Sequence, residues 1–485
     1  MDHSVISWVD LVIIGVYLAV MLGVGVWFVK RIKGEDDFYV AGRSLGPVVI
    51  MATVCATIIG GSAMMGRASK AYSQGFECVM TALPYLIGMY IFSGIAGRIH
   101  LVGKHYGVTS IPDLFRLRFG KLSQILLSIL IALAMMGTVS AQISATARIF
   151  NMVGGSVGIS FEMAALIATL IFIIYTAASG LFGVVYTDVV QFFMLLIFVY
   201  FLIPVRSLSV AGGFSGFLKN LDPEFVKPTF NGRILGDIVT YLVFTLAGAE
   251  MWQRAFAAKD KKTAKRGTFL GTAIYMITIG LIFFMGLVGK QLLPDVVEKY
   301  GSTDAVVPAL AIEILPIGLT GLALAGMLSV MMSTADSYLL VAVQTCVHDV
   351  GKTIRPNMSV RRELTLSRIF TVVLAFGALL LALYVKSIYT ILTGTWAYYA
   401  AAAGFPALAA LYWKKANAPG IVSAIIGGFA VTAIWNLIPK IFHLEGNFLG
   451  LGATVPGAVA SGLLLIIVSL ATCKKYPSKT LTFDE

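Results

Sequence analysis

The sequence predicts an all-α polytopic membrane protein with about 13 transmembrane helices. Hydrophobic residues make up 58% of the 485-residue chain and charged residues only 12%, roughly half the charged share of soluble globular proteins. The apolar residues gather in runs of about 20, the length that a helix needs to cross about 30 Å of hydrocarbon. These runs lack the alternation of membrane barrel strands, so they are expected to be helices within a lipid bilayer.

The predicted spans follow one another along nearly the whole chain. The first run is expected to be a retained helix, because it is too long for a signal-peptide core and its basic flank follows it. The runs cover residues 8–29, 46–72, 79–98, 122–150, 160–181, 185–204, 234–256, 268–290, 316–347, 369–385, 389–412, 418–438 and 454–472.

The basic residues predict the orientation. With the N-terminus outside and the C-terminus inside, the inner loops and tail hold 25 of the 36 Lys and Arg residues, as the positive-inside rule requires. The net charge of +12 therefore reflects topology and indicates no nucleic-acid partner. The four cysteines are scattered without metal-ligand spacing, so neither a disulfide nor a transition-metal site is expected.

The run 46–72 contains a predicted break. Gly60 and Gly61 lie in its middle, between Thr57 and Ser62, and each glycine weakens a helix by about 1 kcal/mol relative to alanine. An unwound stretch exposes backbone carbonyls that suit a small cation, and it is tolerated only where it lines a cavity. Close helix packing through small residues explains the same glycines equally well.

The run 316–347 carries polar residues at membrane depth. Ser333, Asp336 and Ser337 share one helix face because they are spaced three and four apart, and Thr334 adds another hydroxyl. Charged groups at this depth are costly and tend to face a cavity or a partner. A cation or proton site is therefore favoured over a polar clamp between helices.

Other candidate residues have ordinary explanations beside functional ones. Asp188 lies near a helix start, where the helix dipole also favours a carboxylate. Glu250 precedes Arg254 by one turn, which slightly favours an internal ion pair over a cavity carboxylate that faces an amine or carries a proton. Gln142, Trp396 and Tyr399 are candidates for a pocket lining, although interfacial aromatic belts also account for such rings.

Five motifs in chain order resemble the sodium/solute symporter family, which includes the proline permease, the sodium/glucose cotransporters and the choline transporter. The resemblance covers about residues 8–415. The motifs are Asp36-Asp37-Phe38-Tyr39-Val40-Ala41-Gly42-Arg43, the glycine pair followed by Gly66 and Ala71-Tyr72-x-x-Gly75, Tyr186-Thr187-Asp188-x-x-Gln191, Gln253-Arg254 before Ala257-Ala258-Lys259, and Met332-Ser333-Thr334-Ala335-Asp336-Ser337 leading to Asp349.

The resemblance implies one transporter domain, 1–485, with a LeuT-type core of five plus five inverted helices over 46–415. An extra helix (8–29) precedes the core, two helices (418–472) follow it, and 473–485 form a cytoplasmic tail. It implies sodium-coupled symport of a small polar organic solute (an amino acid, an amine or an organic acid) by alternating access. The protein would be multi-pass in the plasma membrane, which in a bacterium is the inner membrane, and it would not be an enzyme.

The resemblance also implies site residues. A sodium ion, the coupling ion, would bind the carbonyls of Ala56, Ile59 and Val330 and the hydroxyls of Ser333 and Thr334. A second cation or proton site would involve Asp188, Asp336 and Ser337. The carboxylate at Asp336 departs from relatives with a hydroxyl there, which leaves a second sodium, a proton or a structural pair open. Solute contacts would come from Gly60, Gly61, Ser62, Gln142, Glu250, Trp396 and Tyr399.

Two alternatives stand beside sodium symport. The carboxylates of Asp188, Glu250 and Asp336 are numerous enough to support proton coupling within the same fold. A membrane solute sensor would use the same core, although signalling relatives append a cytoplasmic domain and the short tail 473–485 argues against one here. The resemblance disfavours a sugar solute, because sugar-transporting relatives carry polar residues where this chain has Ile58, Ser62 and Ala63, and the many hydroxyls of a sugar need many polar partners.

Overall fold

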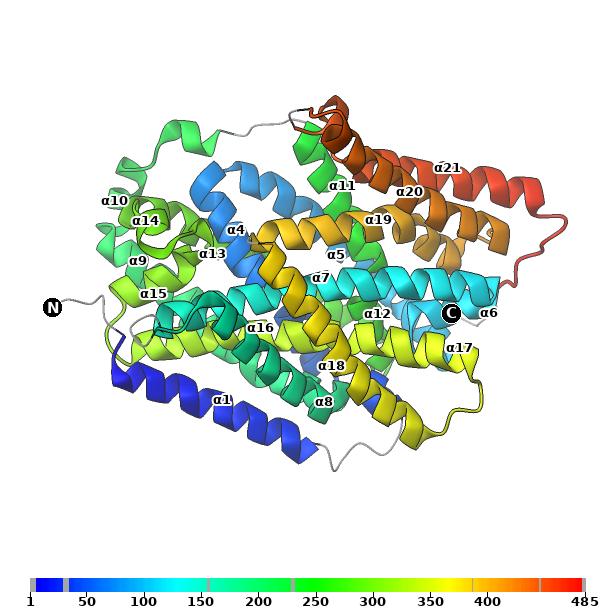
Figure 1. Ribbon diagram of the computed structural model, residues 1–485, viewed down its shortest axis with the longest axis horizontal. Helices are drawn as coiled ribbons and strands as arrows, with labels where there is room; N and C mark the ends of the chain where they lie inside the picture. The colour runs from blue at the N-terminus through cyan, green and yellow to red at the C-terminus, as the bar shows by residue number, and fades with distance from the viewer. Residues whose placement is uncertain are drawn as a thin grey trace.

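A computed structural model describes residues 6–28, 35–154, 158–227, 232–385, 387–444 and 446–481. Lys30, Arg31 and Lys33, the last residues of the tail and the side chain of Ser62 fall outside this description. Within it, regular structure is helical apart from one isolated bridge between Leu45 and Ala258. In Figure 1, α1 and the pair α20 and α21 lie at opposite edges of the bundle, with α7 and α16 between them.

The helices follow the predicted runs closely. The α-helices are α1 (Trp8–Phe28), α2 (Glu35–Val40), α3 (Pro47–Ile58), α4 (Gly61–Gln74), α5 (Glu77–Tyr106), α6 (Ile111–Phe119), α7 (Lys121–Gly154), α8 (Phe161–Met194), α9 (Leu202–Val210), α10 (Gly213–Lys219), α11 (Gly232–Ala247), α12 (Ala249–Ala257), α13 (Lys261–Leu292), α14 (Val296–Tyr300), α15 (Val306–Ile314), α16 (Leu319–Gln344), α17 (Lys352–Ile354), α18 (Val360–Tyr384), α19 (Ile388–Tyr412), α20 (Ala418–Ile441) and α21 (Thr454–Thr472). Two π-helical segments, η4 (Leu195–Phe201) and η7 (Thr345–Gly351), continue α8 and α16.

The prediction of an all-helical membrane protein with many spans is confirmed. In the described ranges, nine helices are long and apolar enough to cross a membrane, or ten when the bent pair α3 and α4 counts as one broken span. Two further apolar stretches, Trp8–Val24 in α1 and Phe161–Ala177 in α8, are shorter. Each of the 13 predicted runs overlaps a helix.

The helix α16 lies at the centre of the bundle. The most apolar stretch of its span, Leu319–Ile354, is 100% buried inside the protein, against 28% for the peripheral span Ala418–Ile441. The burial has a physical reason, because the hydroxyls and carboxylate of α16 would be costly against lipid. The helices α7, α8, α3 and α1 surround it.

Glycines mark three breaks in the spans. The chain bends by 47° between α3 and α4, where a Cβ on Gly60 would lie 2.6 Å from Thr334 Oγ1, so only glycine permits this close approach. Gly248 separates α11 from α12. Within α8, Gly180 has φ 52°, a conformation that favours glycine, and it lies at the predicted boundary between the runs 160–181 and 185–204.

Candidate functional site

Backbone and hydroxyl oxygens converge where α3 ends against α16. Ser333 Oγ and Thr334 Oγ1 each lie 3.3 Å from the carbonyl oxygen of Ala56, and Ser333 Oγ lies 3.0 Å from the oxygen of Val330. The carbonyls of the last turn of a helix have no partner within that helix, and α3 ends at Ile58 with the buried Ile59 as its cap. The structure therefore brings four of the five predicted sodium ligands together, namely Ala56, Val330, Ser333 and Thr334, and Ile59 follows them as the cap of α3.

The oxygen spacing suits a hard cation. Two oxygens that bind one cation at right angles, each at about 2.4 Å, lie about 3.4 Å from one another, close to the distances between Ala56, Ser333 and Thr334. The hydroxyls now donate to the carbonyls, and they would rotate to offer lone pairs to an ion. The predicted ligand set contains no carboxylate, and such a neutral set suits a single positive charge better than two.

The second candidate site contains an arginine. Asp188 Oδ2 accepts a hydrogen bond from Thr53 Oγ1 at 2.5 Å and lies 3.9 Å from Arg254 Nη2. The same Nη2 atom donates to Ser337. Asp188 and Ser337 are thus brought together through Arg254, whereas Asp336 accepts a hydrogen bond from Thr176 at 2.6 Å. Thr53 and Thr176 were not among the predicted residues, because hydroxyls are common in membrane helices.

Arg254 and Glu250 do not form the internal pair that their spacing favours. Arg254 Nη1 donates to the backbone oxygen of Glu250 at 3.1 Å, and the carboxylate of Glu250 instead accepts from Tyr338 OH at 3.2 Å. Glu250 is buried at the start of α12, directly after the break at Gly248. Its position beside a broken helix is consistent with a cavity carboxylate.

Aromatic side chains surround Trp396 on α19. Its ring stacks on Phe244 with centroids 3.8 Å apart and lies 6.1 Å from Tyr85 and 6.0 Å from Tyr241. Tyr399 donates to the carbonyl of Ala247, the last residue of α11. The predicted Trp396 and Tyr399 thus lie against α11 as far as its last residue, at the break between α11 and α12.

Gln142 lies beside the other break. A Cβ on Gly61 would approach Gln142 Oε1 to 3.1 Å and Met331 Cγ to 2.4 Å. Gly60 and Gly61 therefore hold α4 close to both α7 and α16. These contacts place Gln142 beside the predicted sodium ligands, since Thr334 is the nearest neighbour of Gly60.

Sequence reasoning did not single out Arg67, a cation in the second half of the broken span. Arg67 is only 4% exposed, and its guanidinium carbon lies 4.8 Å from the ring centre of Tyr241 and 5.7 Å from that of Tyr85. A lone arginine within the apolar run 46–72 was a signal that could have identified it.

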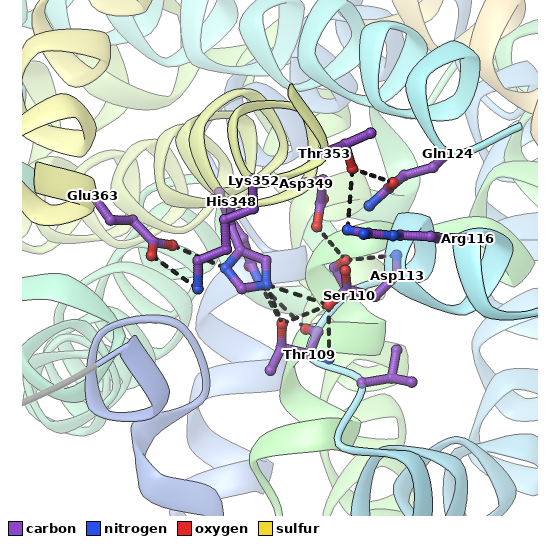
Figure 2. Close-up of polar contacts among 12 residues, drawn as sticks. Thr109, Ser110, Asp113, Arg116, Gln124, His348, Asp349, Lys352, Thr353 and Glu363 are labelled. Carbon is purple, nitrogen blue, oxygen red and sulfur yellow. Dashed lines mark hydrogen bonds and ion pairs between the residues drawn. The ribbon is translucent and has the colours of Figure 1, made fainter. Parts of the chain in front are cut away.

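A third polar cluster joins α6, η7 and α18 at the predicted inner side (Figure 2). His348 Nδ1 lies 2.9 Å from Glu363 Oε1, and His348 Nε2 lies 3.4 Å from Asp113 Oδ2. Lys352 Nζ lies 3.0 Å from Glu363 Oε2, and Ser110 donates to Asp349 Oδ1 at 2.7 Å. Figure 2 shows His348 between the two carboxylates that these contacts link. Of these residues, the sequence motifs included only Asp349.

Asp113 stays charged in this cluster. Burial by itself raises the pKa of the Asp113 carboxyl, but hydrogen bonds with His348 and from Thr109 hold the pKa below its usual 3.8. Thr109 contributes both its backbone N–H and its hydroxyl, at 3.3 and 3.0 Å. The cluster therefore fixes α6 to the end of the central helix by charged hydrogen bonds.

The model of the Sodium:solute symporter family matches residues 38–428. The chain is 29% identical to the sodium/pantothenate symporter of Escherichia coli (strain K12) over 475 residues, 93% of this chain and 94% of the relative. It is 28% identical to the osmoregulated proline transporter of Bacillus subtilis (strain 168) over 488 residues, 96% of this chain and 95% of the relative.

Two solved structures have a similar fold. A sodium-coupled sialic acid symporter in a substrate-bound, outward-open state superposes with a TM-score of 0.79 at 20% identity, covering 98% of this chain and 100% of that one. A closed nucleobase-cation-symport-1 family transporter superposes with a TM-score of 0.59 at 14% identity, covering 91% and 95%. Both are LeuT-fold transporters, which agrees with the predicted class of core.

Proposed function

The chain belongs to the sodium:solute symporter family, and we propose that its driving sodium ion binds where the end of α3 meets α16. The protein is a multi-pass transporter of the plasma membrane rather than an enzyme, and it couples sodium to the symport of a small organic solute. The proposed ligands are the carbonyls of Ala56, Ile59 and Val330 and the hydroxyls of Ser333 and Thr334.

The sodium site is supported by the contact between the two hydroxyls of α16 and the end of α3. Both hydroxyls of α16 reach the same carbonyl of the broken helix, Ala56, at 3.3 Å. A sodium ion at this position would bridge α3 to α16, and the bridge would stabilise one orientation of the broken helix. Solute binding that favours the same orientation is then coupled to sodium binding, and each ligand raises the affinity for the other.

The proposed architecture has 13 spans with the N-terminus outside and the C-terminus inside. The core occupies 46–415, α1 precedes it, and α20 and α21 follow it before the tail at 473–485. The broken pairs α3–α4 and α11–α12 support this arrangement, because discontinuous helices at the repeat interface are typical of inverted-repeat transporters. Rocking of the two repeats about the break would give alternating access.

The proposed solute region lies between the two breaks. Gly60, Gly61 and Gln142 border it at α4 and α7, and Glu250, Trp396 and Tyr399 border it at α12 and α19. Ser62 belongs to the same proposal by its place in the sequence. Pantothenate and proline, the solutes named for the two relatives, are both small carboxylates, so amino acids and organic acids are the first solutes to test.

At the second candidate site, with Asp188, Asp336 and Ser337, we propose that the guanidinium of Arg254 takes the place of a second bound cation. The guanidinium of Arg254 already contacts Asp188 and Ser337. It would balance the Asp188 charge without a second sodium ion. Asp336, which accepts a hydrogen bond only from Thr176 among the described residues, remains the candidate for a bound proton.

Uptake into proteoliposomes tests the sodium site. Radiolabelled pantothenate and proline would be offered with an inward sodium gradient, with potassium alone and with a proton gradient. Sodium-driven accumulation is expected, and Ser333→Ala with Thr334→Ala should raise the sodium concentration for half-maximal uptake by about tenfold or more, since two ligand oxygens are lost. Thr371→Ala removes a buried hydroxyl on α18 that bonds only its own helix and serves as the control. An unchanged sodium dependence in the double variant would refute the site.

A further inference from the structure

Arg67 is a buried cation that meets no acid partner in the part of the chain that the structure describes. Among the described residues, its Nε and Nη1 atoms have no hydrogen-bond partner and its guanidinium forms no ion pair. Its contacts are the ring faces of Tyr241 and Tyr85. Stacking on rings offsets only part of the cost of removing a guanidinium from water, because the N–H groups still lack acceptors.

Other largely buried cations in the same protein are neutralised or fully hydrogen-bonded. Lys70, one turn away on α4, lies 3.5 Å from Asp237, Arg148 lies 3.7 Å from Asp304, and Arg254 pairs with Asp188. Arg118 has no carboxylate partner there, but it donates to backbone oxygens of Ala409, Ala410 and Trp413 at 2.6 to 3.1 Å. Arg148 and Arg254 each leave Nε without an acceptor in the described ranges, but each pairs with a carboxylate. Arg67 differs from these four side chains because, within the described residues, its guanidinium has neither an acid partner nor a hydrogen-bond acceptor.

A second unpartnered donor lies in the same aromatic group. Tyr275 packs edge-on against Tyr85 with ring centroids 5.6 Å apart, and its buried hydroxyl has no hydrogen-bond partner within the described ranges. Arg67 and Tyr275 thus both contact Tyr85 and both have hydrogen atoms to donate. A group with several acceptor oxygens and a negative charge would satisfy both of them.

We propose that the transported solute is a small organic carboxylate and that its carboxylate group binds at Arg67, beside Tyr275. This inference rests on the proposed sodium symport and names the substrate class for it. The planar guanidinium matches a carboxylate with two parallel N–H···O bonds. Arg67 lies in α4, on the predicted outer side of the Gly60–Gly61 break, so the charged end of the solute would face outward.

The aromatic residues orient the rest of the solute. Tyr85 and Tyr241 link Arg67 to Trp396, and Trp396 stacks on Phe244. Beyond them, Tyr399 bonds the residue next to Gly248, which precedes Glu250. An acidic group at that end repels a second carboxylate and accepts hydrogen bonds from hydroxyl or amide groups. A monocarboxylate with an apolar body and neutral donors at its far end fits this order.

A quaternary amine fits the same place poorly. Aromatic side chains often bind such cations through their faces, but here the guanidinium of Arg67 already lies over the face of Tyr241. A second positive charge beside it would be repelled. Arg67 therefore reverses the expectation of an amine solute that Glu250 alone suggests.

Matched probes test the substrate class. Sodium-driven uptake and sodium-dependent thermal stabilisation of the full-length protein would be measured with pantothenate, proline, lactate and benzoate. Panthenol, which replaces the carboxylate of pantothenate by an alcohol, is the neutral counterpart, and choline and glucose complete the set. Response to at least one carboxylate, with no response to panthenol, choline or glucose, is expected. If only choline or glucose is taken up or stabilises the protein, the inference is overturned. It is also overturned if no carboxylate is taken up or stabilises the protein. The parent sodium proposal fails separately, if sodium itself neither stabilises the protein nor drives any uptake.

Variants of Arg67 test the residue. Arg67→Met should raise the KM for the accepted carboxylate at least about tenfold, while the sodium concentration for half-maximal stabilisation stays unchanged. Arg67→Lys should recover part of the loss. The matched control Arg148→Met removes a largely buried arginine with its own acid partner and should leave the preference for the carboxylate over its neutral counterpart intact. Equal KM values for wild type and Arg67→Met would overturn the assignment.

A milder substitution covers the case in which Arg67→Met does not fold. Tyr275→Phe removes only the hydroxyl, and it should raise the KM for the carboxylate by about threefold to tenfold without changing sodium binding. An unchanged KM in Tyr275→Phe together with an unchanged KM in Arg67→Lys would overturn the proposed carboxylate site.

Discussion

The Nη2 atom of Arg254 lies 3.9 Å from Oδ2 of Asp188, and this contact joins α12 to α8 in the centre of the bundle. Both side chains are fully buried, so each neutralises a charge that would otherwise be costly inside the membrane. Ser337 and Thr53 add hydrogen bonds to the two partners. The pair therefore connects the α3 end of the proposed sodium site with the face of α16 that carries Ser337.

Asp188→Asn should destabilise the folded protein. The amide keeps the shape of the side chain but leaves Arg254 charged and unpaired, which costs about 3–5 kcal/mol for a buried pair. Adding Arg254→Met should restore much of this stability, because the uncompensated charge is gone. The melting temperatures of the two single variants and of the double variant in detergent measure the energetic coupling between Asp188 and Arg254. If the stability losses of the single variants simply add in the double variant, the two side chains do not form a direct pair.

The sodium dependence of uptake should show one ion per cycle. With Arg254 at the second candidate site, only the site at Ala56, Ser333 and Thr334 remains for sodium, so a Hill coefficient of about 1 is expected. Initial uptake rates over a sodium series, with ionic strength held constant by choline chloride, provide the measurement. A coefficient that approaches 2 would mean that a second sodium binds despite the guanidinium.

Alanine at the helix break should impair transport without preventing insertion. A Cβ on Gly60 would lie 2.6 Å from Thr334 Oγ1 and one on Gly61 would lie 2.4 Å from Met331 Cγ, and such overpacking costs about 1–3 kcal/mol. Because Thr334 is a proposed ligand, Gly60→Ala should weaken sodium dependence as well as rate.

The matched control for these alanines is Gly94→Ala on α5. A Cβ at Gly94 meets no atom within 4 Å, so this variant should transport normally. Uptake normalised to the amount of protein in the membrane compares the three variants. If Gly60→Ala keeps the normal sodium dependence of uptake, the close approach of Gly60 to Thr334 is not needed for sodium binding, which contradicts the prediction.

Asp113→Asn should lower stability at neutral pH but not in acid. The folded-state pKa of Asp113 lies below its usual 3.8, so the carboxylate contributes stability above the unfolded-state pKa of about 4 and loses it as the pH falls through the folded value. A loss of about 1–3 kcal/mol is expected at pH 7. Melting curves of the wild type and of Asp113→Asn at pH 7 and at pH 3 test the prediction. A loss of stability in the variant that is as large at pH 3 as at pH 7 would contradict it.

Much of the candidate site could be predicted from the sequence, and the exceptions are instructive. The sequence shows Gly60 and Gly61 and the hydroxyls of Ser333 and Thr334 as small or polar residues within apolar runs, and the structure brings Gly60 and Thr334 together. The partner of Arg254 could not be predicted. Glu250 lies one helical turn before Arg254 and was therefore the favoured partner, but in the folded protein Arg254 pairs with Asp188. His348 and Asp113 are 235 residues apart in the chain, and no local pattern links two residues at such a separation.

The sequence by itself determined that the chain lies in a membrane, where its helices fall and where the broken helix bends. Those properties follow from hydropathy and backbone preference, which depend on neighbouring residues. Only the tertiary structure decided which charges are paired. Asp188 and Asp237 neutralise Arg254 and Lys70, while Arg67 is left beside tyrosine rings. Charge pairing depends on distance and burial between helices that are remote in the chain, and these are set only when the bundle packs.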